Sequence, residues 1–110
     1  MSLSLNEYQH LALRTAGKHG DGERTLIYTT LGLNGEAGEV AELVKKAFFH
    51  GHELPREQLK HELGDVLWYV AVLAWTMGWD LDEVAQENIA KLARRYPEGF
   101  SDERSRHRTE

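Results

Sequence analysis

Two pairs of carboxylates are the residues of this sequence best placed to do chemistry. Glu36 and Glu39 are three residues apart, and so are Glu62 and Asp65. On a helix, residues three apart share one face, so each pair projects together. Carboxylates that converge between packed helices repel one another unless a cation lies among them. Because every ligand atom is an oxygen, the pattern favours a hard ion: Mg²⁺, or Mn²⁺ as the alternative.

Glycines beside these carboxylates favour a metal site over the simpler reading, two solvated acidic surfaces. Gly35, Gly38 and Gly64 lie among the four acids, and Gly32 precedes them. Each glycine costs about 1 kcal/mol relative to alanine in a helix interior. We therefore expect either a kink or restart of the helix near Asn34, or a close approach to its backbone.

Hydrophobic periodicity and capping residues predict the helices that must position the carboxylates. The expected helices cover about residues 5–16, 23–50, 55–78 and 80–96. No stretch alternates like a set of strands, so the sequence predicts an all-α bundle of four or five helices. Residues 1–100 should form a single domain, and residues 101–110 a polar, flexible tail.

The third predicted helix has no polar side between Val66 and Trp75. A helix that is apolar all round must be buried all round, and three other short helices can hardly enclose it. We therefore expect a second copy to complete the bundle, as a homodimer or homotetramer. The alternative is a tight monomer with its aromatic side chains at a partly exposed rim.

Charge and composition exclude several classes of partner. The chain has 110 residues, with 13 Lys and Arg against 18 Asp and Glu and a formal charge of −5, so we expect neither a nucleic acid polymer nor an anionic membrane as partner. The absence of cysteine excludes disulfides, thiolate zinc sites and iron–sulfur clusters, and it fits a reducing compartment. With a polar start and no apolar run long enough to cross a bilayer, the sequence predicts a cytoplasmic protein.

The carboxylate pairs and their flanking residues together resemble the MazG-like, all-α nucleoside triphosphate pyrophosphohydrolases. Residues 36–39 (EAGE) and 62–65 (ELGD), with 22 residues between them, are similar to the ExxE…ExxD signature of that family. Residues 33–42 resemble its first motif helix, residues 62–69 its second, and residues 88–97 its C-terminal Asn-x-x-Lys helix, which ends in Arg-Tyr-Pro. The similarity covers roughly residues 25–100.

The resemblance implies an enzyme that cleaves (d)NTP to (d)NMP and pyrophosphate with Mg²⁺. It assigns the metal to four ligands, Glu36, Glu39, Glu62 and Asp65. Such an ion offsets the charge of the triphosphate and lowers the pKa of a bound water. Our choice of general base is Glu36. Attack on the α- or β-phosphorus, the number of metal ions and the preferred base and sugar stay open.

Positive and polar side chains should meet the phosphates. Lys46 lies two turns after Glu39 on the same helix face, and Asn88, Lys91 and Arg95 form one stripe on the fourth helix. The family similarity implies phosphate contacts for Asn88 and Lys91. For Lys46 and Arg95, ordinary solvated charge is an equally good interpretation.

Tyr69 is the candidate for a base or sugar contact. It follows Asp65 by about one helical turn and should therefore point near the metal site. The neighbouring Trp68 and Trp75 are better interpreted as core residues.

Three other functions compete with this hypothesis. A phosphoribosyl-ATP or dUTP-preferring pyrophosphohydrolase of the same superfamily would share the four carboxylates. A di-iron bundle needs Glu-x-x-His on two helices, whereas only Glu7 and His10 have that spacing. A non-catalytic helical interaction module would explain the apolar third helix but neither the carboxylates nor the glycines.

Overall fold

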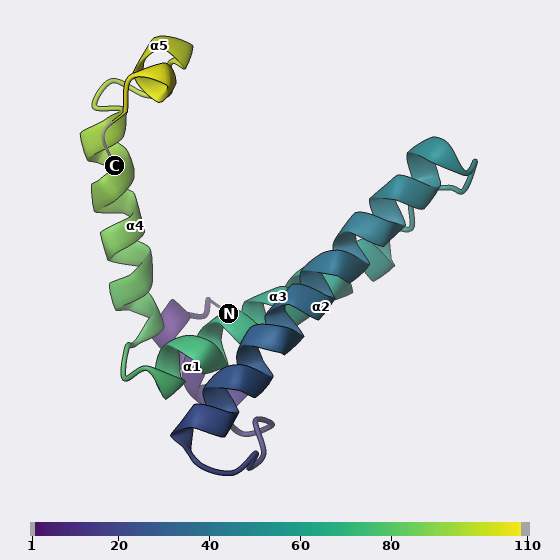
Figure 1. The fold of residues 1–110 in the computed structure, drawn as a ribbon, viewed down its shortest axis with the longest axis vertical. Helices are drawn as coiled ribbons and strands as arrows, with labels where there is room; N and C mark the ends of the chain where they lie inside the picture. Colours follow the sequence, from purple (N-terminus) through teal and green to yellow (C-terminus); the bar gives the residue numbers. More distant parts are fainter. Residues whose placement is uncertain (1, 109–110) are drawn as a thin grey trace.

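The computed structural model describes residues 2–108, and helices make up most of this part of the chain (Figure 1). In order they are α1 (Leu5–Leu13), α2 (Gly22–Phe49), α3 (Arg56–Thr76), α4 (Leu81–Arg95) and α5 (Asp102–Arg106). No β-strand occurs among residues 2–108. The prediction of an all-α fold with four or five helices is confirmed.

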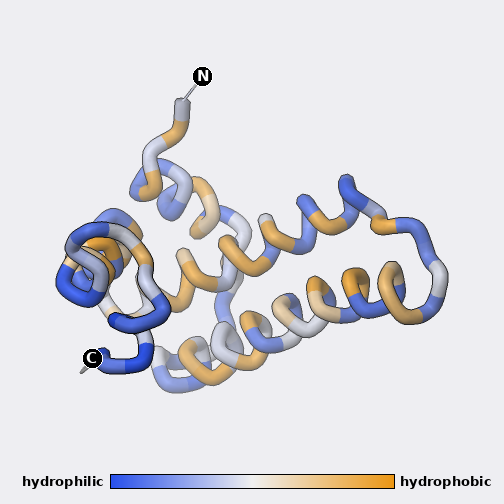
Figure 2. Tube along the Cα trace, turned by 90° about the horizontal axis from the view of Figure 1, so that it is seen from above, coloured by the Kyte–Doolittle hydropathy of each residue, from blue (hydrophilic) through white to orange (hydrophobic). Residues whose placement is uncertain are grey.

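Helices α2 and α3 form a long antiparallel hairpin (Figures 1 and 2). The turn between them begins at the C-cap residue His50 and continues through Gly51, whose φ of 73° is in the left-handed region that favours glycine. Because the two carboxylate pairs lie on these two helices, the hairpin brings them to one interface.

Short-range capping interactions set where the helices begin. Ser4 and Glu7 form a reciprocal capping box at the start of α1, and the side chains of Asp21 and Asp80 accept backbone hydrogen bonds at the starts of α2 and α4. The sequence predicts Pro55 as the first helical residue of α3, whereas in the structure Pro55 is the N-cap and the helix begins one residue later, at Arg56.

Helix α2 is uninterrupted from Gly22 to Phe49, so of the two alternatives expected for its glycines a restart near Asn34 does not occur. Among its interior glycines, Gly32 meets the predicted close approach, because the Tyr69 ring from α3 lies against it. Gly35 and Gly38 have open space where a Cβ would be, as has Gly64 on α3. Packing within one chain therefore explains Gly32 but not the other three glycines.

The core lies where α1, α3 and the start of α4 meet. Ala12, Ala71 and Leu81 are buried there, with Tyr8 and Trp68 packed against them. Beside this cluster a fully buried side chain, Gln9, links all three helices through hydrogen bonds.

The complete burial predicted for residues 66–75 is not found within the single chain. Ala71, Val72 and Ala74 are buried, whereas Leu67 is 39% exposed and Trp75 is 48% exposed. Large apolar side chains are also exposed on α2, where Leu31 is 67% and Phe48 is 73% accessible. Figure 2 shows hydrophobic segments recurring along both helices of the hairpin. Among residues 2–108, no helix combines the length and the apolar character needed to cross a bilayer.

Helix α4 leaves the hairpin and runs away from it (Figure 1). Its first turn is tied to α1, since Asp82 N donates to Asn6 Oδ1 over 2.8 Å, but Ile89 farther along is 65% exposed. The segment predicted as a flexible tail contains α5, which Ser101 caps. The flexibility of that segment stays a prediction.

Candidate metal centre

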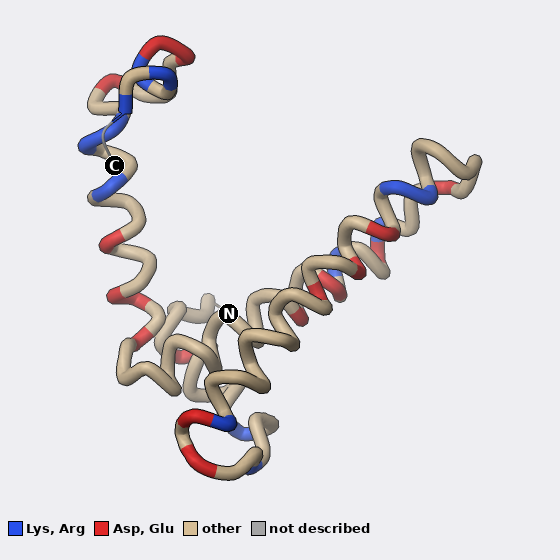
Figure 3. Tube along the Cα trace, viewed as in Figure 1, with Lys and Arg blue, Asp and Glu red and all other residues tan. Residues whose placement is uncertain are grey.

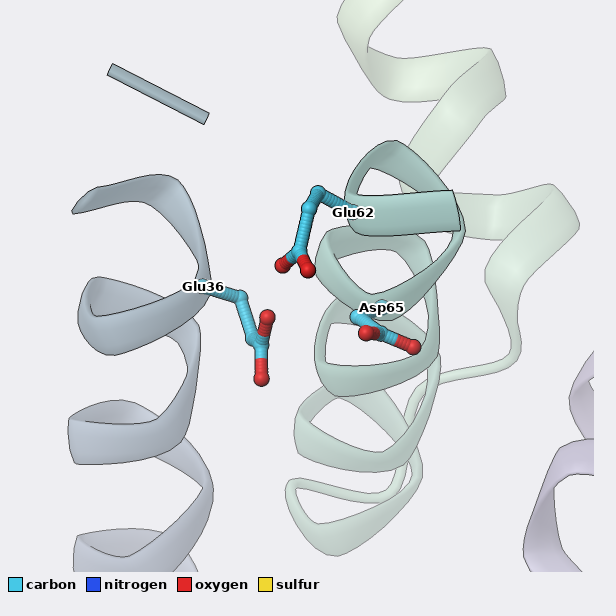
Figure 4. A group of neighbouring side chains, drawn as sticks. All are labelled: Glu36, Glu62 and Asp65. Atoms are coloured by element: carbon cyan, nitrogen blue, oxygen red, sulfur yellow. The ribbon is translucent and has the colours of Figure 1, made fainter. Parts of the chain in front are cut away.

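Three carboxylates converge between α2 and α3. Glu36 projects from α2 toward Glu62 and Asp65, which lie one turn apart on α3 (Figure 4). Each offers an oxygen atom, and these three atoms all lie within 4.8 Å of one another. The i,i+3 spacing aligns the two acids of α3, and the register of the hairpin places Glu36 opposite them.

The surroundings of Glu36 raise its pKa to about 7. The largest cause is a hydrogen bond that its protonated carboxyl can share with Glu62, followed by desolvation and by the negative charges of Asp65, Glu62 and Glu39. In Figure 3 acidic residues gather along the middle of the hairpin with a few basic residues among them, whereas the basic residues of α4 and α5 lie far from it. The lysines that form ion pairs on the hairpin bind Glu42 and Glu57 rather than the three carboxylates.

The donor set fits a hard divalent cation. Ligands about 2.1 Å from Mg²⁺ lie at most about 4.2 Å apart, so three oxygen atoms within 4.8 Å need only a small adjustment to share one ion. Oε2 of Glu62 is buried. When Glu36 and Glu62 are both ionised, no described residue donates a hydrogen bond to this oxygen. A buried carboxylate oxygen without a donor is costly, and a cation would satisfy it.

Glu39, the fourth predicted metal ligand, lies outside this group of three. Its side chain is exposed on α2, one turn after Glu36, and its charge contributes to the raised pKa of Glu36. It is therefore near the group without belonging to it.

A shallow depression of about 340 Å³ opens beside the carboxylates. Its lining residues are Thr15, Glu36, Asp65, Trp68 and Tyr69. It thus joins two acids to two aromatic side chains, which could contact a flat, uncharged group next to an anion held by a metal. Tyr69 lies where the sequence placed it, next to the acidic group.

Three ring side chains, Tyr69, Tyr28 and His19, follow one another from this depression toward the start of α2. The Tyr69 ring is 6.3 Å from the Tyr28 ring, and the Tyr28 ring stacks on His19 with 3.7 Å between ring centroids. The pKa of Tyr69 is raised, first by desolvation, then by a hydrogen bond with Tyr28 and by the charges of Tyr28, Glu36 and Asp65. The phenol of Tyr69 therefore interacts with Tyr28 and with the charges of the acidic group.

The predicted phosphate ligands are not at the carboxylates in this chain. Lys46 lies near the end of the hairpin, 3.9 Å from Glu42. Asn88 and Lys91 lie on the part of α4 that diverges from the hairpin (Figure 1). Arg95 lines a basic depression near α5, where its Nε is buried and has no hydrogen-bond partner among the described residues.

Sequence reasoning missed two residues that line the site. Trp68, assigned to the core, packs against the core and also lines the depression, and its Nε1 donates to Thr15 Oγ1 over 2.9 Å and to Ala12 O over 3.2 Å. The spacing of Trp68 three residues after Asp65 could have indicated a place beside the acids. Thr15 carries no such signal, because only tertiary packing brings the end of α1 to α3.

Comparison with known proteins gives two matches. Residues 24–100 match the model of the MazG nucleotide pyrophosphohydrolase domain. The chain is also 42% identical over 100 residues to the Gene 37 protein of Mycobacterium phage L5, an alignment that covers 84% of this chain and 88% of that protein. No solved structure matches the chain.

Proposed function

Because this chain belongs to the MazG nucleotide pyrophosphohydrolase family, we propose that it cleaves a (d)NTP to (d)NMP and pyrophosphate with a divalent metal, Mg²⁺ or Mn²⁺. The observation that carries this proposal is the convergence of Glu36, Glu62 and Asp65 from two facing helices. Glu39, one turn after Glu36 on α2, is the fourth ligand in this account.

The depression beside the acids supplies the rest of the chemistry. A bound divalent ion offsets the charge of the triphosphate and makes a water more acidic. Glu36 lines the depression and, as general base, accepts the proton of the attacking water. Tyr69, which lines the same depression, contacts the base or the sugar.

A second copy completes the site in this proposal. Asn88, Lys91 and Arg95 lie on α4, which runs away from the hairpin that carries the acidic group (Figure 1). Apolar side chains on α2 and α3 are exposed. In a homodimer or homotetramer those apolar surfaces would be covered, and α4 of one copy could bring its cations to the phosphates at another copy. Lys46 remains a candidate for the same role.

The substrate class within the superfamily is set by base and sugar contacts. A phosphoribosyl-ATP or dUTP-preferring enzyme would use the same carboxylates, so these stand as alternatives to a general (d)NTP pyrophosphohydrolase. A non-catalytic helical module would leave the acidic group and the orphaned Oε2 of Glu62 unexplained. The lack of cysteine supports a cytoplasmic location.

Pyrophosphate release from a panel of nucleotides tests the proposal. The panel holds the common NTPs and dNTPs, dUTP and phosphoribosyl-ATP, each assayed with Mg²⁺, with Mn²⁺ and with a chelator. We expect release that requires the metal and differs among nucleotides. No release from any member of the panel would contradict the proposed activity.

A further inference from the structure

The absent side chain of Gly32 creates a notch on α2 that the Tyr69 ring fills. A Cβ built on Gly32 would overlap this ring, with Cδ1 only 2.8 Å away and Cε1 and Cζ nearer still. Real Cβ atoms essentially never come so close to another atom, so alanine at position 32 would force the ring to move.

The notch holds the hydroxyl-bearing end of the ring, because Cζ is among the overlapping atoms. In this position the phenol interacts with Tyr28, and the charges of Glu36 and Asp65 act on it. Trp68 packs edge-on against the same ring at 4.9 Å between centroids. The ring is thus constrained both by the backbone of α2 and by its neighbour Trp68 on α3.

The loop between α1 and α2 depends on the same aromatic neighbours. His19 stacks on Tyr28, and its Nε2 is 2.8 Å from Ala16 O. Thr15 is bound to the indole of Trp68. A shift of Tyr69 would therefore disturb both the wall of the depression that Tyr69 forms and the packing that holds the loop beside it.

We propose that Gly32 is a positioning residue for nucleotide recognition, acting by letting Tyr69 lie across α2 beside the carboxylates. This inference rests on the proposed function, because Tyr69 is taken to contact the nucleoside. It also explains why glycine stands at a helix-interior position where alanine would be about 1 kcal/mol better.

A double-mutant comparison tests this role. Gly32→Ala should raise KM for the preferred nucleotide by about 10-fold or more and change kcat less, because binding geometry rather than metal chemistry is disturbed. In a Tyr69→Ala background the same substitution should change KM by less than about 2-fold, since no ring remains to be displaced. Gly22→Ala adds the same methyl group where nothing lies within 4 Å and should leave KM unchanged.

Two further readouts separate this proposal from the proposed function itself. The ring signals of Tyr69 in protein with ¹³C-labelled tyrosine should shift in Gly32→Ala but not in Gly22→Ala, and the Mg²⁺-dependent increase in melting temperature should persist in both. If wild-type protein releases no pyrophosphate, both the proposed function and the role of Gly32 in nucleotide recognition are wrong. The ring signals of Tyr69 would still show whether the ring packs against Gly32.

Additive effects of Gly32→Ala and Tyr69→Ala on KM would overturn the positioning role with the activity intact. So would a shifted Tyr69 ring accompanied by an unchanged KM. If Gly32→Ala does not fold, Gly32→Ala/Tyr69→Ala is compared with Tyr69→Ala alone: equal KM values support the proposal, and a further loss on adding the methyl group contradicts it.

Discussion

The carboxylates of Glu36 on α2 and Glu62 on α3 face each other across the hairpin, with oxygen atoms within 4.8 Å (Figure 4). Two like charges at this distance destabilise the metal-free fold unless one is protonated or a cation binds. The raised pKa of Glu36, about 7, reflects first the hydrogen bond with Glu62 that protonation allows, then desolvation and this repulsion. The stability of the protein should therefore depend on both pH and metal.

The first prediction concerns pH. Glu36 has a pKa of about 7 in the folded chain and an ordinary value of 4.5, so between these values the folded state binds more protons than the unfolded state. This group's contribution is therefore present at low pH and is lost as pH rises toward and through 7. In the presence of a chelator, the melting temperature of Glu36→Gln minus that of wild type should increase from pH 5 to pH 8. A difference that stays the same across this pH range would contradict the link between Glu36 ionisation and stability.

Metal should reverse this trend in the wild type. A divalent ion that binds the folded chain raises its stability by mass action, and it binds best when the carboxylates are ionised. Melting temperatures at pH 8 with Mg²⁺ should therefore exceed those in chelator, with a smaller increase in Glu36→Gln.

The second prediction concerns Gln9, whose side chain is fully buried. Its Nε2 donates to Ala71 O over 3.0 Å and to Trp79 O over 3.2 Å, and its Oε1 accepts from Leu81 N over 3.0 Å. Gln9→Ala removes these bonds, leaves the buried Leu81 N without its acceptor and opens a cavity, which should cost about 2–4 kcal/mol of unfolding free energy. Urea denaturation measures this loss, and Gln58→Ala on the exposed side of α3 should change it little.

The third prediction is a homo-oligomer, because Leu31, Phe48 and Trp75 are too exposed for an isolated chain. Light scattering coupled to size exclusion should give at least twice the chain mass of 12.6 kDa. Leu31→Glu should weaken the association, and Thr30→Glu, at a neighbouring exposed position that faces elsewhere on α2, should not. A 12.6 kDa species at micromolar concentration would contradict the prediction.

The fourth prediction separates nucleoside from phosphate contacts. Tyr69→Ala should change the ranking of bases or sugars, because the ring lines the depression beside the acids. Lys91→Ala should weaken all nucleotides about equally, because the phosphates are common to them. Steady-state kinetics with the nucleotide panel measures both, and the opposite pattern would reverse the two assignments.

Local signals in the sequence predict much of this fold. The capping residues Ser4, Asp21 and Asp80 mark helix starts through contacts within a few residues. The i,i+3 carboxylates indicate which faces of α2 and α3 should meet, and the structure brings Glu36, Glu62 and Asp65 together. These features depend on helix geometry alone, which spacing encodes directly.

Other features depend on tertiary packing, which spacing does not encode. The glycines signal a close approach, but only the register of α2 against α3 determines that Tyr69 meets Gly32 while Gly35 and Gly38 stay open. The bridging role of Gln9 joins residues 62 and more positions apart. The direction of α4 likewise depends on how its first turn docks against α1. The sequence therefore predicts that Asn88, Lys91 and Arg95 share one helix face, but it does not predict how far that face lies from the carboxylates.

Pyrophosphate release by Glu62→Gln tests the central claim, that these carboxylates hold the catalytic metal, most directly. The substitution keeps nearly the same shape but removes one negative charge and one anionic ligand, so we predict a loss of about 100-fold or more in Mg²⁺-dependent turnover. The metal-free variant should be no less stable than wild type, because repulsion with Glu36 is relieved, and Glu57→Gln on the exposed first turn of α3 should keep full activity. Wild-type turnover and an unchanged Mg²⁺-dependent melting shift in Glu62→Gln would contradict the carboxylate metal centre.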